Sequence, residues 1–130
     1  MTEKLPDLSR FELQCLRRVW ERGEASVREV QTAFDPPPTY STLRKIFERL
    51  EEKGAVKRVR RQGRAWVYRS AVRPSTMIRR ELRRFLDTLF DGSAGPLIAH
   101  LADMDELSVQ DVQELEKRLD KRGRRKGEGT

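Results

Sequence analysis

A cluster of basic side chains in the middle of the chain is the feature most able to do chemistry. Between Arg44 and Arg73 the sequence has 11 Lys or Arg residues and 3 Asp or Glu residues. These cations can bind phosphate oxygens, and an arginine guanidinium can also donate to two acceptors on a guanine edge. The cluster favours binding of a polyanion such as a nucleic acid over the alternative, a basic surface that only keeps the protein in solution.

The charge is unevenly distributed along the chain. Residues 1–74 hold 17 basic and 10 acidic residues, residues 75–130 hold 11 of each, and residues 85–120 hold 2 basic and 9 acidic residues. This separation predicts a polyanion-binding module joined to a module with another task.

Catalytic and metal chemistry have little support in the sequence. The single cysteine, Cys15, and the single histidine, His100, lie in different predicted parts, so they are not expected to form a nucleophile–base pair. The spacing of metal ligands and a glycine-rich phosphate loop are both missing. We therefore predict no enzyme activity, no catalytic residue, no metal and no cofactor, and we expect Cys15 to be a small apolar residue in the core or half-buried.

The location of the protein follows from similar observations. A lone cysteine suits a reducing cytoplasm. The sequence has no apolar run of about 18 residues that could span a membrane, and its first residues do not resemble a secretory signal. We expect a cytoplasmic protein that is not inserted into a membrane.

Helix-start signals define the elements that would position the basic cluster. Capping boxes begin at Ser9 and Ser26, and Thr39 can cap a third helix after the prolines at 36–38. The predicted helices cover residues 9–22, 27–34 and 40–54, and a β-hairpin over residues 56–70 turns at Gln62 and Gly63, where a positive φ is needed. We predict a mainly α fold with a small β-hairpin, a winged helix-turn-helix over residues 1–74.

The remainder of the chain reads as a helical dimerisation region over residues 75–120. It contains predicted helices at 76–90, 96–101 and 109–119, whose apolar stripes are too large for helices this short to leave in water. Residues 121–130 are predicted to be a disordered basic tail. The candidate dimerisation residues are Ile78, Leu82, Phe85, Leu86, Leu89, Val112, Leu115 and Leu119.

The third helix and the hairpin carry the candidate contacts to DNA. A recognition helix enters the major groove at its N-terminal end, and basic residues near the hairpin turn can reach phosphates or a minor groove. For Arg44, a base contact and a phosphate or solvent contact remain equally open. Trp66 and Tyr68 share one strand face and are expected to be packing residues. The candidates are Thr39, Tyr40, Ser41, Thr42, Arg44, Lys45, Arg60, Arg61 and Arg64.

Several stretches, taken in order, resemble the penicillinase-repressor (BlaI/MecI-type) family of bacterial winged-helix regulators. The likeness covers roughly residues 8–119. Its strongest parts are residues 8–13 with Val19 and Trp20, then 26–30, 40–43, 49–54 and 63–68, with 89–93 and 99–101 in the C-terminal part.

The resemblance implies a homodimeric transcriptional repressor that binds a dyad-symmetric DNA operator and releases it on induction. It also implies contacts to bases and phosphates at residues 40–42. A membrane sensor with a metalloprotease domain is an implied partner, and the corresponding cleavage site is His100–Leu101, where staphylococcal members have Asn-Phe. The cysteine cluster of copper-responsive relatives is missing.

Two other readings use the same layout. A winged-helix module can act as a protein–protein adaptor without specific DNA recognition, and the basic hairpin argues against that role. An RNA-binding protein would prefer single strands to a duplex.

Overall fold

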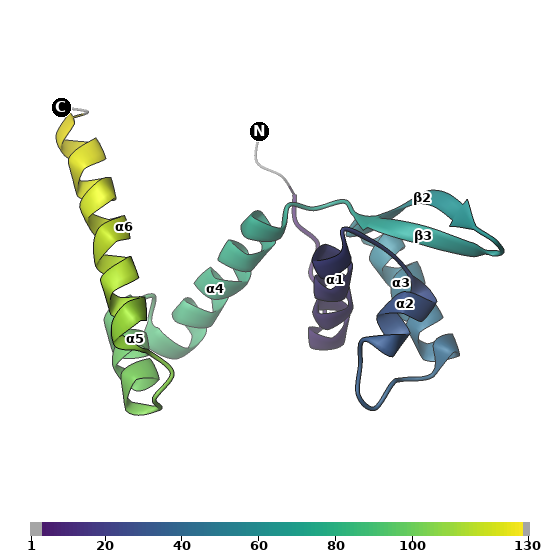
Figure 1. Ribbon diagram of the computed structural model, residues 1–130, viewed down its shortest axis with the longest axis horizontal. Coiled ribbons are helices and arrows are strands. Elements are labelled where there is room, and N and C mark those ends of the chain that lie inside the picture. The colour runs from purple at the N-terminus through teal and green to yellow at the C-terminus, as the bar shows by residue number, and fades with distance from the viewer. Residues whose placement is uncertain (1–3, 129–130) are drawn as a thin grey trace. The chain divides into compact units, whose positions relative to one another are not determined.

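The structure is a computed structural model that describes residues 4–128, with the side chains of residues 4–124. The chain divides into two compact units at Arg80, and each is described by itself. Figure 1 labels the helices of both units and the strands of the hairpin. In the described part of the chain, no helix has the length and apolar character needed to cross a membrane.

Reciprocal caps begin the first two helices of the N-terminal unit. α1 is Arg10–Arg22, and its cap Ser9 accepts a hydrogen bond from the Glu12 amide at 3.2 Å, while the Ser9 amide donates to the Glu12 carboxylate at 2.7 Å. α2 is Val27–Thr32, with the same exchange between Ser26 and Glu29. Both capping boxes predicted from the sequence are confirmed.

The third helix, α3, is Tyr40–Glu52, capped by Thr39. The side-chain amide of Gln31 on α2 donates to the Pro38 carbonyl at 3.0 Å and so fixes the loop that leads into α3. The helix buries a stripe of four apolar residues against the other helices and the sheet, namely Leu43, Ile46, Phe47 and Leu50. Its opposite face is thereby left for solvent or a ligand.

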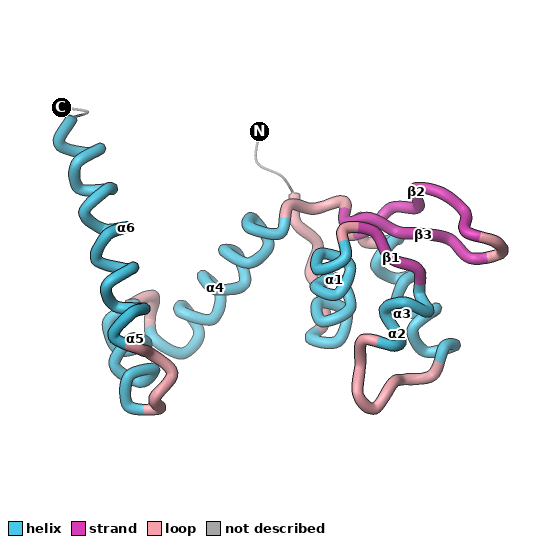
Figure 2. The backbone as a smooth tube through the Cα atoms, in the orientation of Figure 1, coloured by secondary structure: helices cyan, strands magenta, loops and turns pink. Residues whose placement is uncertain are grey.

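The sheet has three antiparallel strands in the order β1-β3-β2. β2 is Val56–Gln62 and β3 is Ala65–Ser70, and they form the predicted hairpin, here called the wing. Gly63 has φ +65°, as its turn position requires. β1, Glu24–Ser26, was not predicted from the sequence, because three residues are too few to show an alternating pattern. Figure 2 shows β1 beside β3 and the wing extending beyond it.

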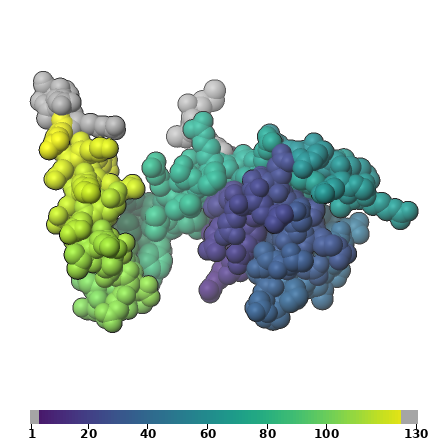
Figure 3. Space-filling view, in the orientation of Figure 1, coloured from purple at the N-terminus to yellow at the C-terminus, as the bar shows by residue number. Residues whose placement is uncertain are grey.

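The core of this unit lies between α1, α2, α3 and the sheet, which pack closely in Figure 3. The rings of Phe47 and Tyr68 meet at a centroid distance of 5.0 Å. Cys15 is fully buried, as expected. Three helices followed by an antiparallel hairpin make the unit a winged helix-turn-helix, so the predicted fold class is confirmed.

The N-terminal unit continues past the boundary predicted at residue 74. α4 is Pro74–Phe90 and not residues 76–90, because a proline is tolerated in the first turn of a helix. Met77 is fully buried in the core, and the Arg80 guanidinium donates to the Leu5 carbonyl at 3.0 Å and to the Pro6 carbonyl. The start of α4 therefore belongs to the DNA-binding module predicted from the sequence.

The C-terminal unit holds the rest of α4 together with α5, Ala94–Asp103, and α6, Val109–Glu128. Ser108 and Asp111 exchange hydrogen bonds of 3.0 and 2.9 Å at the start of α6. The helix passes its predicted end at Leu119, so the tail predicted as disordered is helical as far as Glu128, while residues 129–130 lie outside the described residues. Ion pairs at i,i+4 such as Glu114–Arg118, at 3.5 Å, favour this extension.

Candidate nucleic-acid interface

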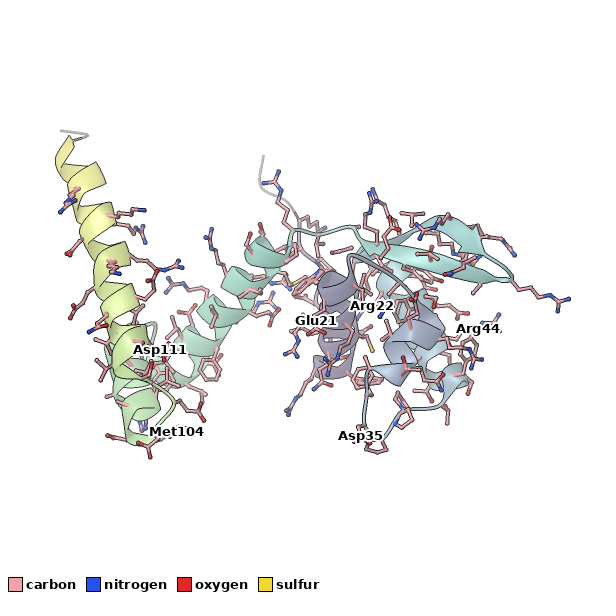
Figure 4. The ribbon with its side chains drawn as sticks, in the orientation of Figure 1. Glu21, Arg22, Asp35, Arg44, Met104 and Asp111 are labelled. Carbon is pink, nitrogen blue, oxygen red and sulfur yellow. The ribbon has the colours of Figure 1, made fainter. Side chains whose placement is uncertain are left out.

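The exposed face of α3 carries the candidate base-reading residues. The side chains predicted to contact DNA from this helix all lie at exposed positions, namely Thr39, Tyr40, Ser41, Thr42, Arg44 and Lys45. Arg44 points outward from α3 (Figure 4), and its guanidinium is 3.7 Å from the Glu48 carboxylate. So long a pair between mostly exposed groups is weak, and an acceptor on DNA can replace it.

Hydroxyl groups gather at the N-terminal end of α3. The Thr39 hydroxyl accepts from the Thr42 amide at 3.3 Å and bonds the Thr42 hydroxyl at 2.8 Å, while Ser41 lies 3.4 Å away. Thr39 therefore acts first as a helix cap that places its neighbours. Ser41 and Thr42 stand at the positive end of the helix dipole, which suits contact with phosphate or with base acceptors.

Arg28 belongs to the same surface, although the sequence did not predict it as a contact residue. Its guanidinium carbon lies 5.3 Å from the centroid of the Tyr40 ring, so α2 holds an aromatic residue at the entrance of α3. The contact joins residues from different helices, and only the three-dimensional structure brings them together.

A β-bulge decides which way the wing arginines point. Side chains alternate along a strand, but the register of β2 against β3 shifts between Arg58 and Arg60, which leaves Val59 unpaired. As a result Arg58 and Arg61 lie on the strand face that Trp66 shares, and their guanidinium carbons are 5.0 and 4.6 Å from its ring centroid. Arg60 points to the other face.

Arg60 is engaged within the protein. The Glu24 carboxylate accepts from the Arg60 guanidinium and, at 2.7 Å, from that of Arg69. These hydrogen bonds, first from Arg60 and then from Arg69, lower the pKa of Glu24. Glu24 thus ties β1 to both strands of the wing, which makes Arg60 a weaker candidate for phosphate contact than Arg61 or Arg64.

A polar cleft of about 320 Å³ lies between α3 and the wing. Four arginines and one carboxylate are among its lining groups, together with the rings of Tyr40, Trp66 and Tyr68. The cleft therefore has an excess of positive charge and is continuous with the exposed face of α3. The charged residues that line it are Arg44, Glu48, Arg58, Arg61 and Arg64.

Most of the candidate dimerisation residues are exposed to solvent on this single chain. Leu86 is half-buried, whereas the other seven are exposed; the highest exposed fractions are 65% at Leu119 and 64% at Leu89. The seven are Ile78, Leu82, Phe85, Leu89, Val112, Leu115 and Leu119.

The candidate cleavage site lies inside a helix. His100 and Leu101 both belong to α5, with His100 exposed and Leu101 half-buried. The His100 ring lies 5.8 Å from that of Phe90, centroid to centroid. A protease that needs an extended substrate could not bind this bond until α5 unwinds locally.

Comparison with known proteins identifies the family. The model of the penicillinase repressor family matches residues 8–121. The penicillinase repressor of Bacillus licheniformis is 27% identical over 128 residues, covering 97% of this chain and 99% of that protein. The methicillin resistance regulatory protein MecI of Staphylococcus aureus is 25% identical over 126 residues, covering 94% of this chain and all of that protein.

A solved structure agrees on the fold alone. A mutant of MarR from E. coli matches with a TM-score of 0.53 at 17% identity, covering 88% of this chain and 77% of that one. The family match spans both units of the chain, and the resemblance seen in the sequence is confirmed. The chain belongs to the penicillinase repressor family, a family of DNA-binding transcriptional repressors that are not enzymes.

Proposed function

We propose that this chain represses transcription as a homodimer that binds a palindromic operator in duplex DNA through α3 and the wing. The observation that carries the proposal is a single continuous surface, in which the exposed polar face of α3 meets a cleft lined by arginines. A helix enters the major groove of DNA while neighbouring cations neutralise phosphates, and both parts are present here. Similarity to a repressor supports the same role, since the relative in Bacillus licheniformis is a penicillinase repressor.

Sequence reading is assigned to the first turns of α3. Ser41 and Thr42 can bond base edges or phosphates, and Arg44 can reach two acceptors of a guanine. Lys45 lies next to Arg44 and supplies a second cation. Thr39 and Tyr40 position this end of the helix, while Arg60, Arg61 and Arg64 provide the candidate backbone contacts of the wing.

Dimerisation is assigned to the apolar residues of α4 and α6. Eight large apolar side chains of these two helices are exposed, seven of them candidate dimerisation residues, and large exposed apolar patches mark interaction sites. A two-fold dimer would present two copies of α3 and so requires an operator with two matching half-sites. The partner proposed for this apolar surface is the same surface on a second copy of the chain.

Release from the operator is assigned to changes in the C-terminal unit. Cleavage between His100 and Leu101 by a membrane sensor metalloprotease would divide α5 and leave the DNA-reading surface untouched. Because the bond lies within α5, the proposal requires local unwinding before cleavage. Limited digestion with a protease of broad specificity, followed by mass spectrometry, would show whether this helix opens before the others.

Specific binding can be tested with two α3 variants. Thr42→Ala and Arg44→Ala are expected to weaken binding to the operator by about 1–3 kcal/mol, with a smaller loss on unrelated duplex, because base contacts add only on the correct sequence. The operator is first selected by mobility shift from genomic fragments and then used in titrations by fluorescence anisotropy.

A matched control is Arg17→Ala, an exposed arginine of α1 paired at 3.4 Å with Glu21, which should leave binding nearly unchanged. Equal losses of binding free energy on the operator and on unrelated duplex would show that Thr42 and Arg44 contact phosphates and not bases. If the wild-type chain selects no duplex, the protein–protein adaptor is the better reading, and tighter binding to single-stranded RNA would favour an RNA-binding protein.

A further inference from the structure

Trp66 occupies an unusual place for a residue expected only to pack. It is half-buried on β3, directly across the hairpin from Arg61, and two guanidinium groups lie over its ring. Tyr68, two residues further along the same face, is buried against Phe47. The two aromatic residues therefore have different surroundings, and the ring of Trp66 opens onto the cleft between α3 and the wing.

The two arginines over Trp66 differ in their other partners. The guanidinium of Arg58 lies 3.0 Å from the Glu51 carboxylate, so its charge is compensated within the protein. Within residues 4–124, Arg61 has no carboxylate in ion-pairing range, and its guanidinium carbon lies 4.6 Å from the centroid of the Trp66 ring. Trp66 therefore holds one cation whose charge is still available to a ligand.

An indole surface can fix an arginine without neutralising it. The attraction between a cation and an aromatic face restrains the guanidinium plane, while its N–H groups remain able to donate to an anion. A lone exposed arginine must lose much of its side-chain freedom when it binds. An arginine already held over Trp66 has lost part of that freedom in advance, which strengthens its binding.

We propose that Trp66 is a positioning residue that holds the Arg61 guanidinium in the cleft, where it binds one phosphate of the duplex backbone. This inference rests on the proposed function. Tyr40 and Arg44 of α3 line the same cleft, so a DNA strand read by α3 passes its backbone along it. The positive excess of the lining fits any anion, whether a phosphate or an acidic side chain of a protein. Of these, the phosphate of the DNA backbone is the anion that binding through α3 would bring to the cleft.

The β-bulge is what makes the arrangement possible. In a regular strand, Arg58 and Arg61 would point to opposite faces because they are three residues apart. The extra residue at Val59 brings both to the Trp66 face and turns Arg60 toward Glu24. One irregularity therefore separates a phosphate-binding arginine from one that braces the sheet.

The test is a double-mutant cycle between Arg61→Gln and Trp66→Leu, measured by anisotropy on a labelled mixed-sequence duplex of about 20 base pairs. Arg61→Gln should lower the slope of log K against log salt by about 1 for each bound chain, measured between about 50 and 200 mM salt. Trp66→Leu should lower the slope in the same direction. The factor by which Arg61→Gln weakens binding should be roughly threefold smaller in the Trp66→Leu background.

Two further variants serve as controls for this experiment. Trp66→Phe keeps an aromatic face and should restore most of the wild-type slope, which a purely space-filling role would not require. Lys57→Gln removes a cation from the opposite face of β2, and its effect should be the same with Trp66 or Leu at position 66. Circular dichroism and urea unfolding identify any variant that fails to fold, and in that event the comparison of Trp66→Phe with wild type decides the question.

The outcomes separate this inference from the function on which it rests. If the wild-type chain binds no duplex, the proposed function fails. If it binds but Arg61→Gln has the same effect in both backgrounds, or Trp66→Leu leaves the slope unchanged, the role of Trp66 is overturned. Inorganic phosphate should displace the labelled duplex no better than chloride does at equal ionic strength. If phosphate displaces the duplex better than chloride, and Arg61→Gln abolishes that difference, the cleft binds a free anion instead.

Discussion

At the scale of single residues, the buried carboxylate of Glu12 both caps α1 and contacts the end of α3. Its carboxylate accepts from the Ser9 amide and, at 2.7 Å, from the Lys53 ammonium beyond the end of α3. Burial raises the pKa of Glu12, but the hydrogen bonds from Lys53 and Ser9 outweigh it, so the pKa is lowered from 4.5. The pair links the start of α1 to the end of α3, and so helps to fix the helix that is proposed to read DNA.

Stability should therefore decrease in acid through Glu12. A carboxyl whose folded pKa lies below its unfolded value stabilises the fold fully above about pH 4.5, and this contribution is lost as the pH falls through the folded value. Glu12→Gln keeps a side chain that can complete the capping box but removes the titration. We expect its free energy of unfolding, from urea titrations between about pH 6 and pH 3, to depend less steeply on pH than that of the wild type. Parallel curves for the two proteins would contradict this role.

At the scale of elements, the parts that sequence could predict are those set by local chemistry. The capping boxes at Ser9 and Ser26 set the helix starts through contacts within four consecutive residues, and Gly63 sets the turn of the wing. The missed features depend on contacts between distant segments. β1 exists because it pairs with β3, the bulge at Val59 appears only in the register of two strands, and Arg28 meets Tyr40 across two helices.

The start of α4 shows the same limit and carries its own prediction. Met77 looks like part of a C-terminal helix in the sequence, yet it is fully buried in the N-terminal core. Met77→Ala should destabilise the N-terminal unit by about 2–5 kcal/mol, because it leaves a cavity in a packed site. The control is Arg79→Ala, an exposed neighbour on α4, which should change stability by no more than about 0.5 kcal/mol. Urea unfolding of the full chain measures both, and equal effects would show that α4 is not anchored through Met77.

At the scale of the whole molecule, the proposed function assigns DNA reading and dimerisation to different units, and the boundary between the units falls inside α4. The N-terminal unit ends at Arg80, where α4 is still bound to the chain near Leu5, and the same helix then carries Leu82, Phe85 and Leu89 in the C-terminal unit. A single element thus belongs both to the module proposed to bind DNA and to the surface proposed to dimerise. If the chain dimerises as proposed, loosening the C-terminal unit would change how two copies of the N-terminal unit are held together and would leave each copy unchanged.

A comparison of two fragments tests this division. Residues 1–80 contain Met77 and Arg80, so this fragment should fold, remain monomeric and bind the operator at least about tenfold more weakly than the full chain, because it loses the effective concentration of a linked second site. Residues 1–74 lack both side chains and should unfold at a lower urea concentration than residues 1–80, since the core then has a gap where Met77 packs. Sedimentation gives the assembly state, urea titration the stability, and anisotropy the affinity. A dimeric 1–80 fragment, or one that binds as tightly as the full chain, would show that the apolar residues of α4 and α6 serve some purpose other than joining two DNA-binding units.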